Sequence, residues 1–222
     1  MKKMIILSAS PKKGEPSVSN LLSDMAKERF SSSGIQADII DVRQTLTAQS
    51  CTPVYDAMRE ADGLLIVFPL YIFCMPAMLT RFLEDYAQYL GSVSKTQKIY
   101  TIVNCGFPES EINEEAVRVI QSFSRHVGAC FRFGISFGSG GMMMGAKDAP
   151  FMKKPMTTLN NAFDIMAKDM RDEQLPPLKN VNIKVGFPRR LYYFAANLGW
   201  YKHAKQNGLK KSDLYRQPYR TE

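Results

Sequence analysis

The sequence is poor in the residues that usually hold metal ions. It has only two histidines, His126 and His203, which lie far apart in the chain. Its four cysteines, at positions 51, 74, 105 and 130, form no Cys-x-x-Cys pair. The wide spacing predicts reduced thiols, as in cytoplasmic proteins, and argues against a disulfide framework. We therefore expect neither a zinc site nor an iron–sulfur cluster.

Long hydrophobic runs and several well-known catalytic motifs are also absent. No apolar run approaches the roughly 18 residues that cross a membrane. The run Met4–Leu7 is shorter than the apolar core of a secretion signal, so we expect a cytoplasmic protein. The sequence contains no Gly-x-x-x-x-Gly-Lys-Ser/Thr or His-Glu-x-x-His motif. These absences argue against a P-loop nucleotidase and a zinc protease.

The charge is unevenly distributed along the chain. The formal net charge is +8, yet residues 1–170 hold 18 basic and 17 acidic side chains, and residues 171–222 hold 11 and 4. A nearly neutral body argues against nucleic-acid binding by that part of the chain. The basic C-terminal segment is a separate question.

Short apolar runs alternate with segments of helical periodicity over the first 170 residues. We expect strands at 4–7, 35–42, 63–68, 99–103 and 130–137, and helices at 17–31, 54–61, 76–90, 111–127 and 155–170. A glycine-rich segment at 138–145 is expected to be a flexible, methionine-lined loop. Five strands alternating with five helices predict an α/β fold with a doubly wound parallel sheet, and ligands bind such sheets beyond the carboxyl ends of their strands.

The loop after the first strand has the features of an anion site. Three serines, Ser10, Ser17 and Ser19, lie between the strand and the helix that follows. Hydroxyl groups and the free N–H groups of a helix N-terminus favour a bound phosphate. A simpler alternative is that Ser17 only caps the helix.

The loop after the third strand is bracketed by Pro69 and Pro76 and contains two aromatic residues, Tyr71 and Phe73. Aromatic side chains at the ligand edge of a sheet favour a flat apolar ligand. The alternative is that they pack on a neighbouring helix or on a dimer partner.

The loop after the fourth strand, residues 104–109, offers polar side chains beside a glycine. Gly106 permits a close backbone approach, and Asn104 and Glu109 supply polar contacts. The alternative is an ordinary turn leading into the next helix, whose dipole Glu111 and Glu114 would favour.

Together these loops resemble a known family. The segments Ser10-Pro11 and Pro16–Ser19 resemble the phosphate loop of the NADPH-dependent FMN reductases, and Pro69–Tyr71 with Met75–Ala77 and Arg81–Glu84 resembles their isoalloxazine loop. The segment Asn104–Glu109 is similar to the third flavin loop of related flavodoxin-like oxidoreductases. The resemblance covers residues 3–150 in order and spacing.

The resemblance implies a flavodoxin-like five-stranded sheet of order 2-1-3-4-5 that binds FMN, within a domain of residues 1–170. It also implies a homodimer and an NAD(P)H oxidoreductase that passes hydride through FMN to a quinone, a nitro or azo compound, or a flavin. The phosphate would be held by Ser10, Ser17 and Ser19 with Lys12 or Lys13, and no side chain is expected to be catalytic. The complete set of implied FMN contacts is Ser10, Lys12, Ser17, Val18, Ser19, Pro69, Leu70, Tyr71, Ile72, Asn104, Gly106 and Glu109.

Residues 171–222 form a basic, aromatic extension that a minimal flavin reductase lacks. We expect a helix over 189–204 and an extended arm over 210–219. We favour packing of this extension on the body or on a dimer partner over binding to an anionic membrane surface. Two other functions stay open: an electron carrier without its own substrate, although such carriers are usually acidic, and a docking module whose flavin site has decayed.

Overall fold

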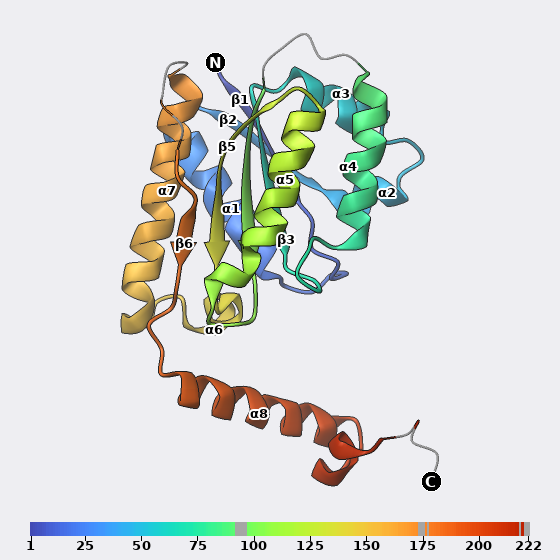
Figure 1. Ribbon diagram of the computed structural model, residues 1–222, viewed down its shortest axis with the longest axis vertical. Helices are drawn as coiled ribbons and strands as arrows, with labels where there is room; N and C mark the ends of the chain where they lie inside the picture. Colours follow the sequence, from blue (N-terminus) through green and yellow to red (C-terminus); the bar gives the residue numbers. More distant parts are fainter. Residues whose placement is uncertain (92–96, 173–175, 177, 218, 220–222) are drawn as a thin grey trace. The chain divides into compact units, whose positions relative to one another are not determined.

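A six-stranded parallel sheet forms the centre of the first 185 residues (Figure 1). The computed structural model describes residues 1–91, 97–172, 176, 178–217 and 219. The strands are β1 (Lys3–Ser8), β2 (Gln36–Asp41), β3 (Gly63–Pro69), β4 (Lys98–Asn104), β5 (Cys130–Phe137) and β6 (Val181–Ile183), in the spatial order β2-β1-β3-β4-β5-β6. Every neighbouring pair is parallel, so the carboxyl ends of all six strands share one edge.

Helices cover both faces of the sheet (Figure 1). The α-helices of this unit are α1 (Val18–Ser32), α2 (Val42–Thr47), α3 (Thr52–Glu60), α4 (Ala77–Leu90), α5 (Glu114–His126), α6 (Met143–Ala146) and α7 (Lys153–Arg171). Helices α1 and α7 contact each other on one face, and α3, α4 and α5 cover the other. Because both faces are covered, β3 is an uninterrupted apolar run whose residues from Gly63 to Phe68 are buried.

Local sequence signals set the ends of α1. Ser17 is its N-cap and accepts a hydrogen bond from the Asn20 N–H at 3.1 Å. At the other end Gly34 has φ of 73°, a left-handed conformation that glycine adopts without steric cost. The Ile35 N–H then bonds back to the Phe30 carbonyl at 3.0 Å, which closes the helix and directs the chain into β2.

The structure confirms the doubly wound parallel sheet and extends it by one strand. β6 pairs with β5 over only three residues, too short a run for periodicity to identify it. Since β6 belongs to the sheet, the first compact unit runs to Val185 and not to residue 170. Helix α2 was also not expected; Asp41 caps it by accepting a hydrogen bond from the Gln44 N–H at 2.8 Å.

A buried ion pair holds α7 against the amino edge of the sheet. The Arg132 guanidinium donates to both carboxylate oxygens of Asp169, at 2.8 Å each, and Asp169 is completely buried. The Tyr100 hydroxyl donates to the same carboxylate at 2.6 Å, and burial raises its pKa, so it remains a donor. Lys98 adds hydrogen bonds to the carbonyls of Asp169 and Asp172 at the end of α7.

The second compact unit, Gly186–Glu222, contains α8 (Arg189–Gln206) and the 3₁₀ helix η4 (Lys211–Tyr215). Helix α8 ends at Gln206, and Gly208, two residues later, has φ of 72°; the Leu209 N–H then donates to the Ala204 carbonyl at 2.9 Å. The expected helix is therefore present, whereas the segment expected to be an extended arm is partly helical. Among the described residues, no helix is long and apolar enough to cross a membrane.

Candidate functional site

The loop after β1 brings the three predicted serines to the N-terminus of α1. All three residues are buried, and each hydroxyl oxygen accepts a hydrogen bond from an N–H group of the chain. Ser10 accepts from the Lys12 N–H at 3.4 Å, Ser17 from the Asn20 N–H at 3.1 Å, and Ser19 from the Asn104 amide at 3.0 Å. A hydroxyl that accepts in this way keeps its own proton to donate. Ser17 thus caps the helix and can still donate to an anion.

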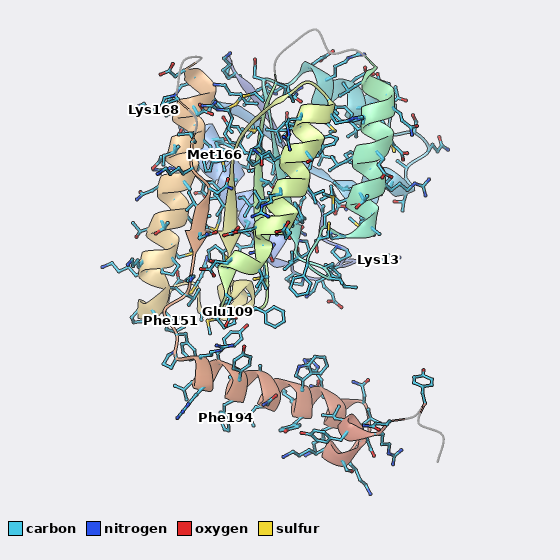
Figure 2. The ribbon with its side chains drawn as sticks, viewed as in Figure 1. Lys13, Glu109, Phe151, Met166, Lys168 and Phe194 are labelled. Carbon is cyan, nitrogen blue, oxygen red and sulfur yellow. The ribbon has the colours of Figure 1, made fainter. Side chains whose placement is uncertain are left out.

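The first turn of α1 adds backbone donors to these hydroxyls. The N–H groups of Val18 and Ser19 belong to the turn whose donors have no acceptor within an α-helix. The positive end of the helix dipole lies at the same place. By contrast, the basic residues of the loop point to solvent: Lys12 is more than half exposed and lies 3.9 Å from Glu15, and Lys13 is exposed as well (Figure 2). Serine hydroxyls and backbone N–H groups, and not lysine side chains, are therefore the donors that this loop could offer to an anion.

The loop after β3 contains a tight turn in an unusual conformation. Tyr71 and Cys74 exchange backbone hydrogen bonds of 2.8 and 2.9 Å, and the two residues between them, Ile72 and Phe73, have φ of 47° and 61°. This is the geometry of a type I′ turn, which normally takes asparagine or glycine at these positions. A β-branched residue with positive φ is a genuine outlier and stores strain.

The side chains of this turn lie at the protein surface. Tyr71 is 48% exposed, Ile72 94% and Phe73 64%. Packing of Tyr71 and Phe73 within the body, one of the two alternatives from the sequence, is therefore not what the structure shows. Pro69 and Leu70 are half-buried, and the Leu70 N–H donates to the Asn104 carbonyl at 2.8 Å. The turn is thus anchored directly to the end of β4.

The loop after β4 departs from an ordinary helix-leading turn. A 3₁₀ helix, η1 (Ser110–Asn113), precedes α5, so the α-helix begins at Glu114 and not at Glu111. Glu109 is half-buried and occupies the residue before η1. The Cys105 thiol donates to the Phe107 carbonyl at 3.4 Å, and burial raises its pKa. The neutral, buried thiol is not a nucleophile.

Asn104 joins the three loops. Its side-chain amide donates to the Ser19 hydroxyl of the first loop and to the Phe68 carbonyl in β3, each at 3.0 Å. Asn104 is buried, so this bridge is shielded from water. The sequence predicted that Asn104 contacts the cofactor, and in the structure its amide donates to the hydroxyl of Ser19, another residue of the predicted set.

The glycine-rich segment after β5 is pinned against the third loop. The Ser139 N–H donates to the Phe107 carbonyl at 2.7 Å, and the Gly140 N–H to the Cys105 carbonyl at 2.8 Å. A Cβ atom added at Gly138 would lie 2.6 Å from the Pro108 carbonyl oxygen, so close backbone approach, and not flexibility, requires glycine here. A 3₁₀ turn and α6 follow, in place of the expected flexible loop. The clustered glycines after a strand were the available signal for this contact.

Gly106 provides a test of whether a planar cofactor fits beside these loops. Its φ is not in the left-handed region, and a Cβ atom added there would meet no protein atom within 4 Å. Neither the conformation nor crowding within the described residues therefore requires glycine. An open space above a backbone that carries no side chain suits close approach of a flat ligand. Together with the serine cradle, the residues present fit a flavin phosphate and ring.

Two pockets lie outside the predicted set of residues. One of about 620 Å³ lies between α4 and α5, and only Met75, from the second loop, reaches it from the ligand edge. The other, of about 470 Å³, lies beside Leu21 and is lined by residues 143–149. Neither contains any of the residues that the sequence assigned to the cofactor.

A parallel sheet of this strand order, with a serine-rich anion cradle at its carboxyl edge, defines a flavodoxin-like protein. The family model of the NADPH-dependent FMN reductases matches residues 2–131. The chain belongs to this family. It is therefore an NAD(P)H-dependent flavin oxidoreductase with FMN and NAD(P)H as cofactors, which confirms the class expected from the three loops.

Solved structures support the same fold at low sequence identity. A NADH:FMN oxidoreductase aligns with a TM-score of 0.60 and 18% identity over 86% of this chain and 98% of its own. An azoreductase from Bacillus anthracis aligns with 0.55 and 15% over 76% and 100%. An NAD(P)H:quinone oxidoreductase from Methanothermobacter marburgensis aligns with 0.54 and 15% over 78% and 96%. No match is found among curated proteins.

Proposed function

We propose that this protein uses FMN bound at the carboxyl edge of β1, β3 and β4 to pass reducing equivalents from NAD(P)H to a small acceptor, which is a quinone, an azo or nitro compound, or a flavin. The observation that carries the proposal is the trio of buried hydroxyls, Ser10, Ser17 and Ser19, whose protons are available to donate at the α1 N-terminus. An azoreductase and a quinone oxidoreductase among the similar structures support the acceptor class.

The chain's own residues have binding and positioning roles in this proposal. The serine hydroxyls and the backbone of Val18 hold the phosphate. Pro69, Leu70, Tyr71 and Ile72 lie along the ring, and Gly106 lets the backbone approach it. Bound FMN supplies the two-electron redox chemistry, and no side chain is required as acid, base or nucleophile.

Lys12, Asn104 and Glu109 complete the proposed set in secondary roles. Lys12 adds charge attraction from the surface, weakened by its neighbour Glu15. Asn104 orients Ser19. Glu109 supplies a polar contact near the far edge of the ring, where it precedes η1.

We also propose a cytoplasmic homodimer in which a second copy completes the flavin pocket. The support is the exposure of Ile72 and Phe73 in the second loop and of Phe107, 55% exposed, in the third. Apolar side chains gathered at a ligand edge are typical of a surface that something covers. Light scattering of the FMN-loaded protein tests this: a monomeric mass contradicts it.

The decisive experiment is reconstitution with FMN followed by desalting and an absorbance spectrum. Retained flavin bands that bleach on anaerobic addition of NADPH and return on addition of a quinone or an azo dye support the proposal. Loss of the bands on desalting, or bands that neither NADPH nor NADH bleaches, contradicts it.

Two variants connect the result to the serine cradle. Ser17→Ala and Ser19→Ala each remove one donor to a charged group, worth about 1.5–3 kcal/mol, and should weaken FMN binding about tenfold or more. Ser23→Ala is the matched control, because Ser23 is buried one turn later in α1 and its hydroxyl donates to the Ser19 carbonyl. If all three variants lose the same FMN affinity, the cause is a general change in α1 and not the loss of a hydroxyl that binds the phosphate.

A further inference from the structure

The unit Gly186–Glu222 exposes apolar and basic side chains together. In α8, Leu191 is 54% exposed, Phe194 63% and Leu198 51%, and Figure 2 shows the Phe194 side chain projecting from the helix. Their spacing of three and four residues places them on one face of the helix. The rest of the unit Gly186–Glu222 buries none of the three side chains of this apolar stripe (Leu191, Phe194 and Leu198).

Two lysines extend the stripe toward the C-terminus of α8. Lys202 and Lys205 follow Leu198 by four and seven residues, so they lie on the same helix face, and both are exposed. In a protein interface, two ammonium groups on an apolar face would lose hydration. At a membrane surface their long stems reach back to the headgroups while the apolar face enters the acyl boundary.

The positive net charge of this unit indicates that its partner is negatively charged. Residues 186–222 contain eight lysines and arginines and two acidic residues, whereas residues 1–185 contain 21 and 19. A second copy of the body, close to neutral, offers no complementary field to a segment of net charge +6. An anionic membrane surface offers such a field. Nucleic acid would also attract the charge, but it has no apolar surface to contact the exposed leucine and phenylalanine side chains.

Tyr215 in η4 adds an aromatic residue with a polar tip, whereas Trp200 and Tyr193 lie on the face of α8 opposite the apolar stripe. Trp200 is 67% exposed and Tyr193 39%, and in η4 Tyr215 is 69% exposed. Phenol groups concentrate at the boundary between hydrocarbon and headgroups. The Lys211 ammonium lies 4.4 Å from the centre of the Tyr201 ring, so η4 keeps its positive charge beside α8.

From these observations we propose that α8 and η4 form a surface-binding element for anionic phospholipid membranes. The apolar stripe enters the boundary of the acyl chains, and the basic residues bind the headgroup layer. This inference goes beyond flavin reduction and does not depend on it, because the element lies in the unit that contains none of the proposed FMN contacts.

Cosedimentation with vesicles makes the proposal directly measurable. The full-length protein is titrated with vesicles of phosphatidylcholine alone or of phosphatidylcholine with phosphatidylglycerol. We expect cosedimentation only with the anionic vesicles, reversed by high salt. Equal behaviour with the two kinds of vesicle, or binding to neither, overturns the proposal.

Paired variants separate charge from hydrophobic contact. In Lys202→Gln/Lys205→Gln the partition coefficient should fall about 25-fold, since each lysine near an anionic surface contributes about a fivefold factor. Lys27→Gln/Lys168→Gln removes the same charge from exposed positions of α1 and α7 and should change partitioning less than about twofold. Equal losses in both pairs mean nonspecific attraction and contradict the assignment to α8.

The remaining alternative is that the stripe is an interface between copies of the chain. Phe194→Ser/Leu198→Ser alters two exposed residues, so folding of the body is not at risk. We expect this variant to lose vesicle binding while its mass by light scattering and its rate of NADPH oxidation in solution stay unchanged. A fall in mass without vesicles shows that the face binds a second copy and overturns the membrane proposal.

Discussion

The side-chain amide of Asn104, at the carboxyl end of β4, donates a hydrogen bond of 3.0 Å to the hydroxyl of Ser19 in the first turn of α1. The same amide group donates to the Phe68 carbonyl in β3. One buried residue therefore sets the distance between strand ends that carry the proposed phosphate and ring loops. Its contribution to binding should be indirect, through the position of Ser19.

Replacing Asn104 tests this relationship. Asn104→Ala leaves the Phe68 carbonyl without its buried side-chain donor and frees Ser19, so we expect about 1–3 kcal/mol lower stability and weaker FMN binding. In a double-mutant cycle with Ser19→Ala, the effects on FMN affinity should be strongly non-additive, because both changes remove one interaction. Isothermal titration of the four proteins measures the coupling. Additive effects would mean that Asn104 and Ser19 act independently.

Much of the fold follows from the alternation of short apolar runs with helical patterns. β3 was expected at residues 63–68 and the structure has it at Gly63–Pro69, because a strand buried on both faces is a continuous apolar run. The sequence did not predict β6 and α2, because elements of three and six residues are too short to show a hydrophobic period. Both depend on tertiary pairing or a single cap.

The candidate site was predictable only at the level of loops. Residue types and positions indicated an anion cradle at Ser10, Ser17 and Ser19, and the three loops do meet at one edge. No sequence signal indicated that Asn104 donates to Ser19 and not toward the ligand, because the direction of an amide depends on contacts 85 residues apart. The sequence also could not predict the strained backbone at Ile72, because isoleucine disfavours a positive φ.

The buried pair Arg132–Asp169 should matter for stability and not for the cofactor. Asp169→Asn leaves the Arg132 guanidinium buried without its carboxylate, which we expect to destabilise the protein by about 3–5 kcal/mol in urea unfolding. The pair lies at the amino edge of the sheet, opposite the proposed site, so FMN affinity of the folded variant should change less than about twofold. A large change in affinity at retained stability would contradict this separation.

We expect the strained type I′ turn to lower the stability of the protein while it presents apolar side chains to the proposed flavin. Ile72→Asn/Phe73→Gly introduces residues that accept positive φ, so thermal unfolding should show a gain of about 1–3 kcal/mol. The same change removes apolar side chains from the loop proposed to lie along the flavin, so FMN affinity should fall. Ile72→Ala is the control, because it truncates the side chain and keeps the strained backbone. If it stabilises the protein as much as the double variant, backbone strain is not the cause.

Burial of Cys105 predicts slow alkylation that depends on unfolding. Its thiol pKa is raised by desolvation, so at pH 8 a smaller fraction is thiolate than for an ordinary cysteine. We expect N-ethylmaleimide to label Cys51, Cys74 and Cys130, which are half-buried, at least about tenfold faster than Cys105. Mass spectrometry of peptides from timed samples measures the four rates. Labelling of Cys105 at the rate of the others in native protein would refute the burial argument.

Gly138 and Gly141 give a matched pair for the contact between the third loop and the segment after β5. A Cβ atom at Gly138 would lie 2.6 Å from the Pro108 carbonyl oxygen, whereas one at Gly141 would meet nothing within 4 Å. Because the obstacle is backbone, Gly138→Ala must displace the loop that carries Gly106, and we expect a loss of about 1–3 kcal/mol together with weaker FMN binding. Gly141→Ala should leave FMN affinity unchanged. If both variants bind FMN like the unaltered protein, the third loop does not contribute to the site, and the proposed contacts at Gly106 and Glu109 are wrong.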